Sequence, residues 1–280
     1  MPTTKKTLMF LASFFTSFGS FVVICAILGN REWISSIVAI SDSSSNGSIA
    51  INYGLFHGHS TQELNHGLAE PDKDFEVLGS LSDSSPKILH LAVILCLVIS
   101  LSTSLLSSGF TFYNSISNPY QTFLGPIGVF TWSGLSAELG QKAKDLVTSS
   151  DILPQLPGFL SQAIAMIVLD LGEPNQRPAG LIGSHCQPSF TFLAMLLCVG
   201  NVQSNHLSED LAQTLYPHYS PATDGRTTHR YGYSFWLMLL IILLDIITVV
   251  IIFFYQKARY QQKQEQRKPM EYAPRDGILF

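Results

Sequence analysis

Charged residues are scarce in this sequence of 280 residues: they make up 13% of it, against 46% hydrophobic residues. This low share of charge, together with a positive mean hydropathy, excludes an ordinary soluble domain and is typical of a chain that crosses a membrane several times. The net charge is only −4, and it gives no reason to expect a nucleic-acid partner.

Cysteine is also scarce, with four residues at positions 25, 96, 186 and 198, and none lies in the polar stretch Arg31–Lys87. We therefore expect no disulfide framework there, and apolar packing is the simpler role for the thiols. The sequence contains no nucleophile elbow, phosphate loop or zinc motif, so it predicts neither an enzyme nor a cofactor. His57, His59 and His66 are too weak a signal for a metal site, because no carboxylate or cysteine stands at ligand spacing.

Three long apolar stretches, residues 8–28, 88–112 and 234–255, predict membrane-crossing helices. About 20 residues at roughly 1.5 Å each cover the roughly 30 Å of hydrocarbon in a bilayer. A cleavable signal peptide is the alternative for the first stretch, but such a region is usually only about 7–15 residues long. Lys5 and Lys6 precede the first stretch, which we take as an uncleaved span, and basic residues follow the last stretch. This predicts that both termini, residues 1–7 and 256–280, are cytoplasmic.

Cytoplasmic termini require an even number of crossings, so a further helix is expected. Two apolar fragments are available, residues 123–137 and 188–206, separated by a charged, proline-containing segment at 138–187. The first fragment reaches only about 22 Å as a helix and contains Gly and Pro. We expect a helix beginning near Pro188, a residue favoured in a first turn, to be the third span, with residues 113–187 on the cytoplasmic side.

Two polar segments, residues 29–87 and 207–233, are then expected to be extracellular loops. In the first loop Trp33–Ile40 and Ser48–Phe56 alternate and are rich in β-branched residues, which predicts two strands of a small antiparallel sheet. Between them Asn46 begins an Asn-Gly-Ser sequon and is a predicted N-glycosylation site. The stretch Glu63–Ser85 is acidic and polar, and we expect it to be either a short helix or a mobile loop.

Small residues recur at helical spacing on the first two predicted helices and predict close packing between them. They are Ser13, Ser17 and Ser20 in the first helix and Ser100, Ser104 and Ser108 in the second.

Asp245 lies near the middle of the last predicted span, about 15 Å from its cytoplasmic end. A charged carboxylate at this depth costs at least about 2.5 kcal/mol on insertion scales, so it is a functional candidate by default. The simpler reading is a protonated Asp245 hydrogen-bonded to Ser or Thr of the second helix. The alternative, an ion or proton pathway, needs several such groups, and the other spans offer none.

The C-terminal tail predicts two kinds of contact. Its basic residues are expected to be attracted to anionic lipid. Its last four residues, Gly277–Phe280, fit a PDZ groove as an added strand, with Ile278 and Phe280 in alternate pockets. An unstructured end is the other reading.

Several segments together resemble the clarins. They are residues 1–8, Asn46–Ser48 with Tyr53–Phe56, His66–Pro71, Ser108–Tyr120, Ser204–Glu209 and Met270–Phe280. The resemblance covers residues 1–137 and 189–280 and implies a claudin-like plan with four spans, a glycosylated first loop, no catalytic activity and a link to sensory cells. The chain departs from this pattern at 138–188, where the family runs directly from Ala137 into Ser189.

The sequence thus predicts an all-α membrane protein, a bundle of four transmembrane helices with a small extracytoplasmic antiparallel sheet in the first loop. The expected function is non-catalytic: organising membrane or adhesion complexes, or serving another membrane protein as an accessory subunit, at the plasma membrane. Expected partners are the lipid bilayer and membrane or PDZ-type scaffold proteins, and the oligomeric state is left open. The alternative is a channel or transporter subunit with Asp245 in a pathway.

Overall fold

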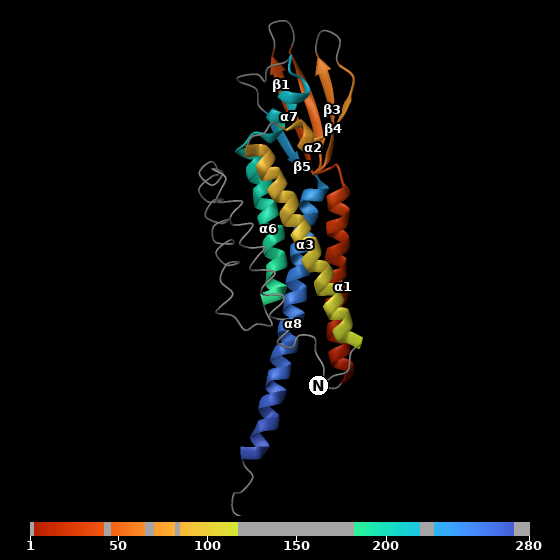
Figure 1. Ribbon diagram of the computed structural model, residues 1–280, viewed down its shortest axis with the longest axis vertical. Helices are drawn as coiled ribbons and strands as arrows, with labels where there is room; N and C mark the ends of the chain where they lie inside the picture. Colours follow the sequence, from red (N-terminus) through yellow and green to blue (C-terminus); the bar gives the residue numbers. More distant parts are fainter. Residues whose placement is uncertain are drawn as a thin grey trace, which may run out of the picture.

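The computed structural model describes residues 3–41, 46–64, 70–81, 85–116, 182–218 and 227–271. They form an elongated molecule in which a small β-sheet and two short helices stand on the ends of four long helices (Figure 1). We call the four long helices the stalk, and the sheet with its two short helices the head.

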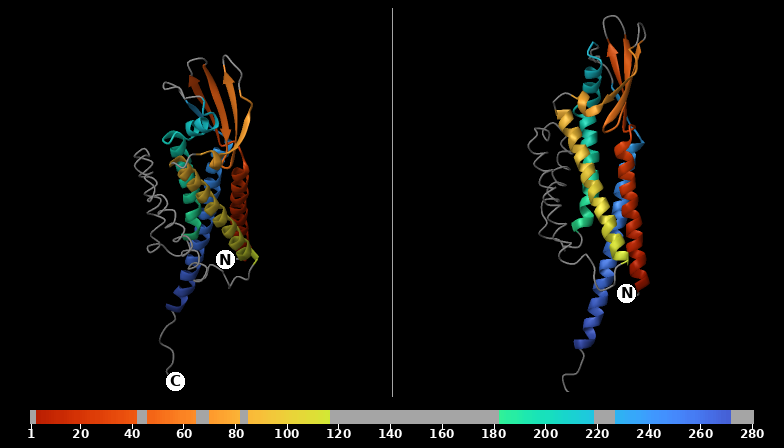
Figure 2. Two further views of the ribbon diagram at one scale, coloured as in Figure 1. Left: turned by 45° about the horizontal axis from the view of Figure 1, so that its top comes forward. Right: turned by 45° about the vertical axis from the view of Figure 1, so that its right-hand side comes forward.

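The stalk consists of α1 (Thr3–Gly29), α3 (Ser85–Ile116), α6 (Ile182–Gln203) and α8 (Tyr233–Glu271). α1 packs beside α3 and α8, and α6 also packs beside α3 and α8 (Figures 1 and 2). The last part of α8 runs on beyond the other helices, away from the head (Figure 1). Each stalk helix therefore has two helical neighbours and one outward face.

Three of these helices contain stretches that are long and apolar enough to cross a membrane: Thr7–Gly29, Ser85–Tyr113 and Tyr233–Tyr255. They coincide with the three long spans predicted from sequence. The apolar part of α6, Ser189–Gln203, is shorter. Large apolar side chains are exposed along the stalk, as expected of surfaces that face lipid; they include Phe15, Phe18, Val98, Leu105, Leu243 and Phe254.

α6 begins six residues before the position expected from its sequence. Pro188 was predicted to open the helix, whereas the helix begins at Ile182 and Pro188 is its seventh residue. A proline inside a helix removes only the hydrogen bond to the carbonyl four residues earlier, here that of Ser184, so the helix bends or weakens locally without having to end. At its other end α6 stops at Gln203, and His206 adopts a left-handed backbone conformation (φ 52°) before the next helix.

The sheet has five antiparallel strands in the order β4-β3-β2-β1-β5. They are β1 (Ile34–Ser41), β2 (Asn46–Tyr53), β3 (His57–Leu64), β4 (Lys73–Glu76) and β5 (Thr228–Tyr231). β1 and β2 match the two strands predicted from sequence to within one to three residues at each end. The sheet was predicted for the first loop, which supplies four of its strands, and the structure adds β5, which comes from the segment before α8 and pairs with β1.

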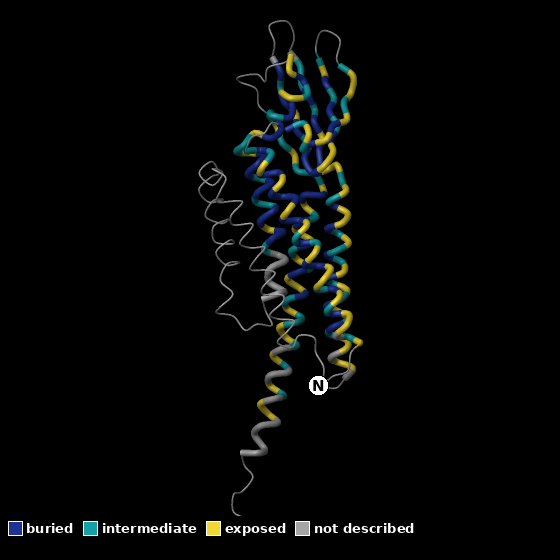
Figure 3. Tube along the Cα trace, viewed as in Figure 1, coloured by how far each residue is buried: buried dark blue, intermediate teal, exposed yellow. Residues whose placement is uncertain are grey.

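One face of the sheet is buried against two short helices, α2 (Val77–Ser80) and α7 (Leu207–Leu215). The strands alternate, so that Ile34, Val38 and Ile40 of β1 and Ile49, Ile51 and Tyr53 of β2 all point into this layer. Figure 3 shows the buried residues continuing from the head down between the stalk helices. The head and the upper stalk therefore share one hydrophobic core.

The junction between head and stalk depends on close backbone contact. Gly54 lies against the backbone of Asn30 and Arg31, and Gly232 against that of Glu32. A Cβ at either glycine would overlap a carbonyl oxygen, so neither position accepts a side chain without moving the backbone. These contacts hold the first residues of β1 and the end of β5 directly on the ends of α1 and α8.

Candidate functional site

The two serine faces predicted for the first and second helices meet in the stalk. All six serines are buried. Ser104 Oγ of α3 donates a hydrogen bond to the Ser17 carbonyl of α1 (2.9 Å), and Ser17 Oγ lies 3.2 Å from Ser107 Oγ. Ser100 instead faces α6, with its Oγ 2.7 Å from Thr191 Oγ1. α3 thus uses neighbouring parts of one polar face to contact two helices.

Ser108 and Ser13 behave differently from the other serines. Ser108 Oγ donates to the Leu105 carbonyl within its own helix at 2.8 Å. Ser13 Oγ is buried and has no hydrogen-bond partner among the described residues. The packing role of these two positions rests on their small size, which allows the helices to approach.

Asp245 is buried at 3% exposure and accepts a hydrogen bond from Ser20 Oγ at 2.7 Å. Ser20 belongs to α1, so the expected partner on the second membrane helix, α3, was wrong. The reason is the arrangement of the stalk, in which α8 packs mainly on α1 and α6. The second carboxylate oxygen, Oδ2, is buried and has no partner within the described residues.

The Asp245 contact is one of several polar contacts spaced along the interface between α1 and α8. Below it Thr16 Oγ1 and Thr248 Oγ1 share a hydrogen bond at 2.7 Å. At the head end Asn30 Nδ2 donates to Ser234 Oγ at 2.6 Å. In lipid, where apolar surfaces give helices little reason to choose one another, such bonds fix the partner and the register.

The histidine cluster considered from sequence does not converge on a metal position. His59 has one carboxylate near each ring nitrogen: Asp74 Oδ1 is 3.2 Å from Nδ1, and Asp72 Oδ2 is 3.8 Å from Nε2. These nitrogens point in opposite directions, so one ion cannot bind both sides. Nowhere in the described ranges do three or more His, Cys, Asp or Glu residues stand together as metal ligands, and His66 lies outside those ranges.

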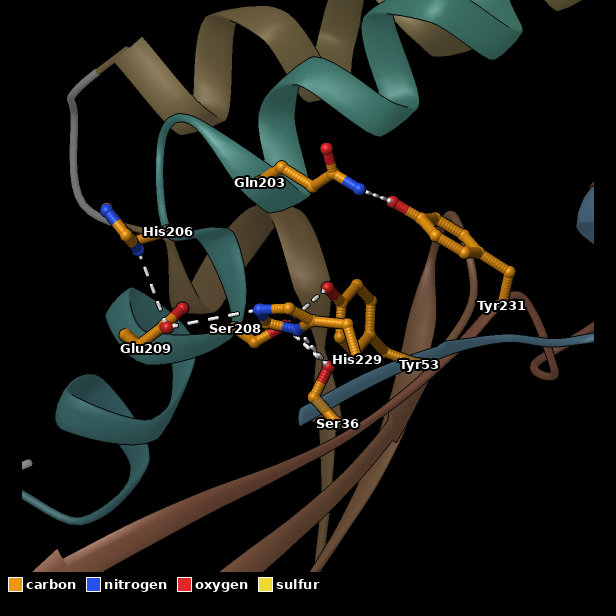
Figure 4. A network of polar contacts seen from close by, with 8 residues as sticks. All are labelled: Ser36, Tyr53, Gln203, His206, Ser208, Glu209, His229 and Tyr231. Carbon is orange, nitrogen blue, oxygen red and sulfur yellow. Dashed lines mark hydrogen bonds and ion pairs between the residues drawn. The ribbon is translucent and has the colours of Figure 1, made fainter. Parts of the chain in front are cut away.

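A buried polar network joins α7 and β5 to the centre of the sheet, and the sequence analysis did not find it (Figure 4). Ser208 Oγ of α7 lies 2.8 Å from Ser36 Oγ and 2.9 Å from the Tyr53 hydroxyl. His229 Nδ1 of β5 lies 2.9 Å from Ser36 Oγ, and its Nε2 is 4.0 Å from Glu209 Oε1. Four separate segments of the chain are tied together in this way.

Burial decides the charge states in this network. It raises the pKa of Tyr53 well above its ordinary value, because an ionised phenol would lose its hydration. It lowers the pKa of His229 for the same reason, and the nearby His206 adds to this, while Glu209 acts in the opposite direction. Both rings are therefore neutral hydrogen-bonding groups at neutral pH.

The serine, histidine and glutamate of this network have the residue types of a catalytic triad, but not its accessibility. Ser36 is 0% exposed, and its hydroxyl is already shared between Ser208 and His229. A substrate carbonyl cannot reach it, so the arrangement positions the second loop on the sheet.

The other face of the sheet is open to solvent and carries mostly small side chains. Cross-strand partners lie on the same face, so the pairing defines rows that run across the strands. The row of this face that crosses all five strands, from β5 to β4, is Arg230, Ser35, Asn52, His59 and Asp74. The next row is Thr228, Ile37, Ala50 and Thr61, in which Ile37 is 48% exposed.

The two edges of this open face, which we call the outer face, have opposite charge. Arg230 stands at the β5 edge, and no carboxylate of the described residues lies within salt-bridge distance of it. Asp72, Asp74 and Glu76 stand at or beside the β4 edge, where Arg31 lies 3.6 Å from Asp74. Sequence alone could not show this separation, because it depends on β5 joining the sheet.

Other predicted positions fall at the limits of the described chain. Asn46 is the first residue of β2, in register with Ser41, at the end of the hairpin farthest from the stalk. Ile278 and Phe280 lie outside the described residues, as do residues 123–137 and almost all of 138–187.

Comparison with known proteins identifies the family. The Clarin-2-like family profile matches residues 4–149. Clarin-3 of Homo sapiens is 58% identical over 280 residues, and clarin-3 of Rattus norvegicus is 59% identical over 280 residues, each match covering all of both chains. The chain belongs to the clarin family. Clarin-1 of Homo sapiens is 27% identical over 154 residues, half of this chain and 64% of its own length.

Family membership confirms the resemblance inferred from the sequence motifs. Its described residues include three helices long and apolar enough to cross a bilayer, and this clarin is a multi-pass membrane protein that is mostly helical and carries a small antiparallel sheet.

Proposed function

We propose that this clarin is a non-catalytic organiser of membrane or adhesion complexes that presents the outer face of its sheet to partner proteins. The observation that carries the proposal is the construction of the head: an open face of mostly small side chains is backed by a buried polar network and a shared core. A solvent-exposed surface with packed support suits protein contact, and the network behind it has no access for a substrate.

The proposed topology has four crossings, with α6 as the third. The 22 residues of α6 extend about 33 Å, which is enough for the hydrocarbon of a bilayer. Lys257 and Arg259 follow the apolar part of α8 and support a cytoplasmic C-terminus, which puts the head outside the cell with Asn46 available for glycosylation. Residues 138–187 would then be cytoplasmic, and Ile278 and Phe280 would be free for a PDZ-type scaffold.

This topology has a direct test. An epitope after residue 150 should be detected only in permeabilised cells, in a protein whose Asn46 carries a glycan. An epitope detected on intact cells would contradict the placement of α6 as the third crossing.

A glycan shield tests the outer face. The double substitution Ala50→Asn with Asn52→Ser creates a sequon in the middle strand of the outer face. We expect proximity labelling at the cell surface to lose the neighbours found with the wild-type chain, while surface delivery is retained. The matched control, Asn46→Gln, removes the natural sequon at the hairpin tip. If the shielded chain keeps the same neighbours as this control, the outer face is not the contact surface.

One observation favours the second candidate, a channel or transporter subunit. Asp245 has a buried carboxylate oxygen with no partner in the described chain, which an ion or proton could occupy. The test is to measure membrane currents in cells that lack the protein, after reintroducing either the wild-type chain or Asp245→Asn. A current that is lost with Asp245→Asn supports an ion or proton pathway. Equal currents with both chains contradict it.

A further inference from the structure

We propose that the outer face of the head binds a second copy of this chain in the same membrane, through a two-fold axis that runs parallel to the strands and lies over β2, midway between the two outer faces. The inference rests on the proposed role of the outer face and names its partner. It starts from the register of the row that crosses all five strands, which runs Arg230, Ser35, Asn52, His59 and Asp74.

The charge pattern of this row is complementary to itself under that symmetry. β2 is the middle strand of the five, with β5 and β4 at the two edges. A two-fold axis along β2 exchanges the edges without shifting the row, so Arg230 of each copy lies over Asp74 of the other. Asn52, on the axis, faces its own counterpart, and two primary amides can exchange hydrogen bonds.

The side chains of the outer face allow two sheets to approach. Ala39, Ser48 and Ala50 are small, and Ile37 is the one large apolar residue of the paired rows. The same symmetry places Ile37 over Thr61 of the second copy, where it fits beside Ala50. Burial of this exposed side chain adds an apolar contact to the two charge pairs.

The direction of the symmetry axis fits two copies in one membrane. The strands continue the direction of the stalk helices (Figures 1 and 2), so an axis along the strands lies along the membrane normal. A copy in a facing membrane would need an axis across the strands, which lays each edge over its own counterpart. Asp72, Asp74 and Glu76 would then meet the same three carboxylates, and like charges would repel.

The contact area is small but sufficient for proteins held in one membrane. The strand spacing of about 4.8 Å and the rise of about 3.4 Å per residue make the outer face on the order of 400 Å². This is less than the roughly 800 Å² per partner of stable complexes in solution. Two copies with parallel axes in one bilayer meet at a high effective concentration, which compensates for a small interface.

Charge reversal tests the contact on full-length chains with donor and acceptor tags, by energy transfer in living cells at matched expression. Copies that all carry Arg230→Glu, or all carry Asp74→Arg, oppose like charges twice, and we expect transfer to fall about fivefold. Arg230→Glu mixed with Asp74→Arg opposes unlike charges at both contacts and should restore transfer. Glu63→Arg, the matched control on the same face, lies over Ala39 of the second copy and should change little.

Each outcome of this experiment is informative. Transfer unchanged by either reversal, or lost without recovery in the mixed pair, overturns the symmetric dimer. Surface labelling of every variant shows that it reaches the membrane. A separate measurement avoids charge: Asn52→Cys lies on the axis and should cross-link to itself with a short bis-maleimide, while Thr214→Cys on α7 should not. Absence of the Asn52→Cys cross-link also overturns the proposal.

Failure of this inference can be distinguished from failure of the proposed function. If charge reversal abolishes self-association while the neighbours found by proximity labelling remain, the dimer is supported and the organising role does not depend on it. If the glycan shield leaves those neighbours in place while the mixed pair still restores transfer, only the organising role is lost.

Discussion

The substitution Ser208→Ala removes the hydroxyl on which the polar network of the head converges. Tyr53 is 0% exposed and its hydroxyl lies 2.9 Å from Ser208 Oγ, so the variant leaves a buried phenol without this partner. Ser36 keeps its hydrogen bond to His229 Nδ1 and is not orphaned. An unsatisfied buried polar group costs about 1–3 kcal/mol, and with one group orphaned we expect a loss of about 2 kcal/mol in the free energy of unfolding.

A second substitution shows whether the orphaned phenol is the cause. Tyr53→Phe removes the phenol oxygen while Ser208 still bonds to Ser36, so we expect a loss of about 1 kcal/mol. The double variant has no orphaned group. Its free energy of unfolding should therefore fall by about 2 kcal/mol, whereas the two single effects add up to about 3 kcal/mol. The difference is a coupling energy of about 1 kcal/mol.

The measurement is thermal unfolding of the purified protein in detergent, where each kcal/mol shifts Tm by about 2–4 °C. Thr214→Ala is the matched control, because Thr214 is an exposed hydroxyl of the same helix that bonds only within α7. It should change stability by less than about 0.5 kcal/mol. Strict additivity of Ser208→Ala and Tyr53→Phe, or an effect of Ser208→Ala as small as that of the control, would refute the reasoning.

Three further predictions concern the stalk, the junction and pH. Asp245→Leu removes a carboxylate that is costly to bury in lipid and one hydrogen bond of about 0.6 kcal/mol, so delivery of the protein to the cell surface should be kept or improved. If surface delivery is lost with Asp245→Leu but not with Asp245→Asn, a polar contact at this position is required. Gly54→Ala should lower the Tm by several degrees because its Cβ meets backbone, whereas Gly109→Ala in α3 meets nothing within 4 Å and should not. Burial lowers the pKa of His229, so the unfolded chain takes up a proton on this ring at higher pH than the folded chain does, and stability should fall as pH drops below about 6.5. His229→Gln should remove this part of the pH dependence of stability. An unchanged pH dependence in this variant would contradict the prediction.

The elements that the sequence predicted well are those whose signal is local. The three long membrane-span candidates are predominantly apolar runs, and β1 and β2 alternate and are rich in β-branched residues, so composition and periodicity within each segment were enough. β3 was missed because its alternation is polar on both faces: Ser60 and Gln62 point inward, while His59 and Thr61 point outward. No hydrophobic pattern marks such a strand, and only pairing with β2 reveals it.

The candidate site was missed for a related reason. Ser36 and Ser208 are 172 residues apart in the chain and touch through their hydroxyl groups. A buried serine looks like a loop serine in sequence, because nothing beside it records the partner. The one usable signal is the apolar spacing of α7, where Leu207 and Leu211 share a buried face and place the neighbouring Ser208 against the sheet.

The stalk and the head are aligned by one continuous contact between two antiparallel segments. α1 leads into β1 and β5 leads into α8, so the pair α1 and α8 below the junction becomes the pair β1 and β5 above it. At the crossing Gly232 N donates to the Trp33 carbonyl at 2.7 Å, and Asn30 Nδ2 donates to Ser234 Oγ.

A helix that slides by one turn moves by about 5.4 Å, whereas a strand must move by two residues, about 6.8 Å, to keep the same face inward. The two steps do not match, so neither pair can shift without breaking the other. The Ser20 contact of Asp245 within the stalk therefore helps to set which residue of β1 lies beside Arg230, and with it the charge pattern of the outer face.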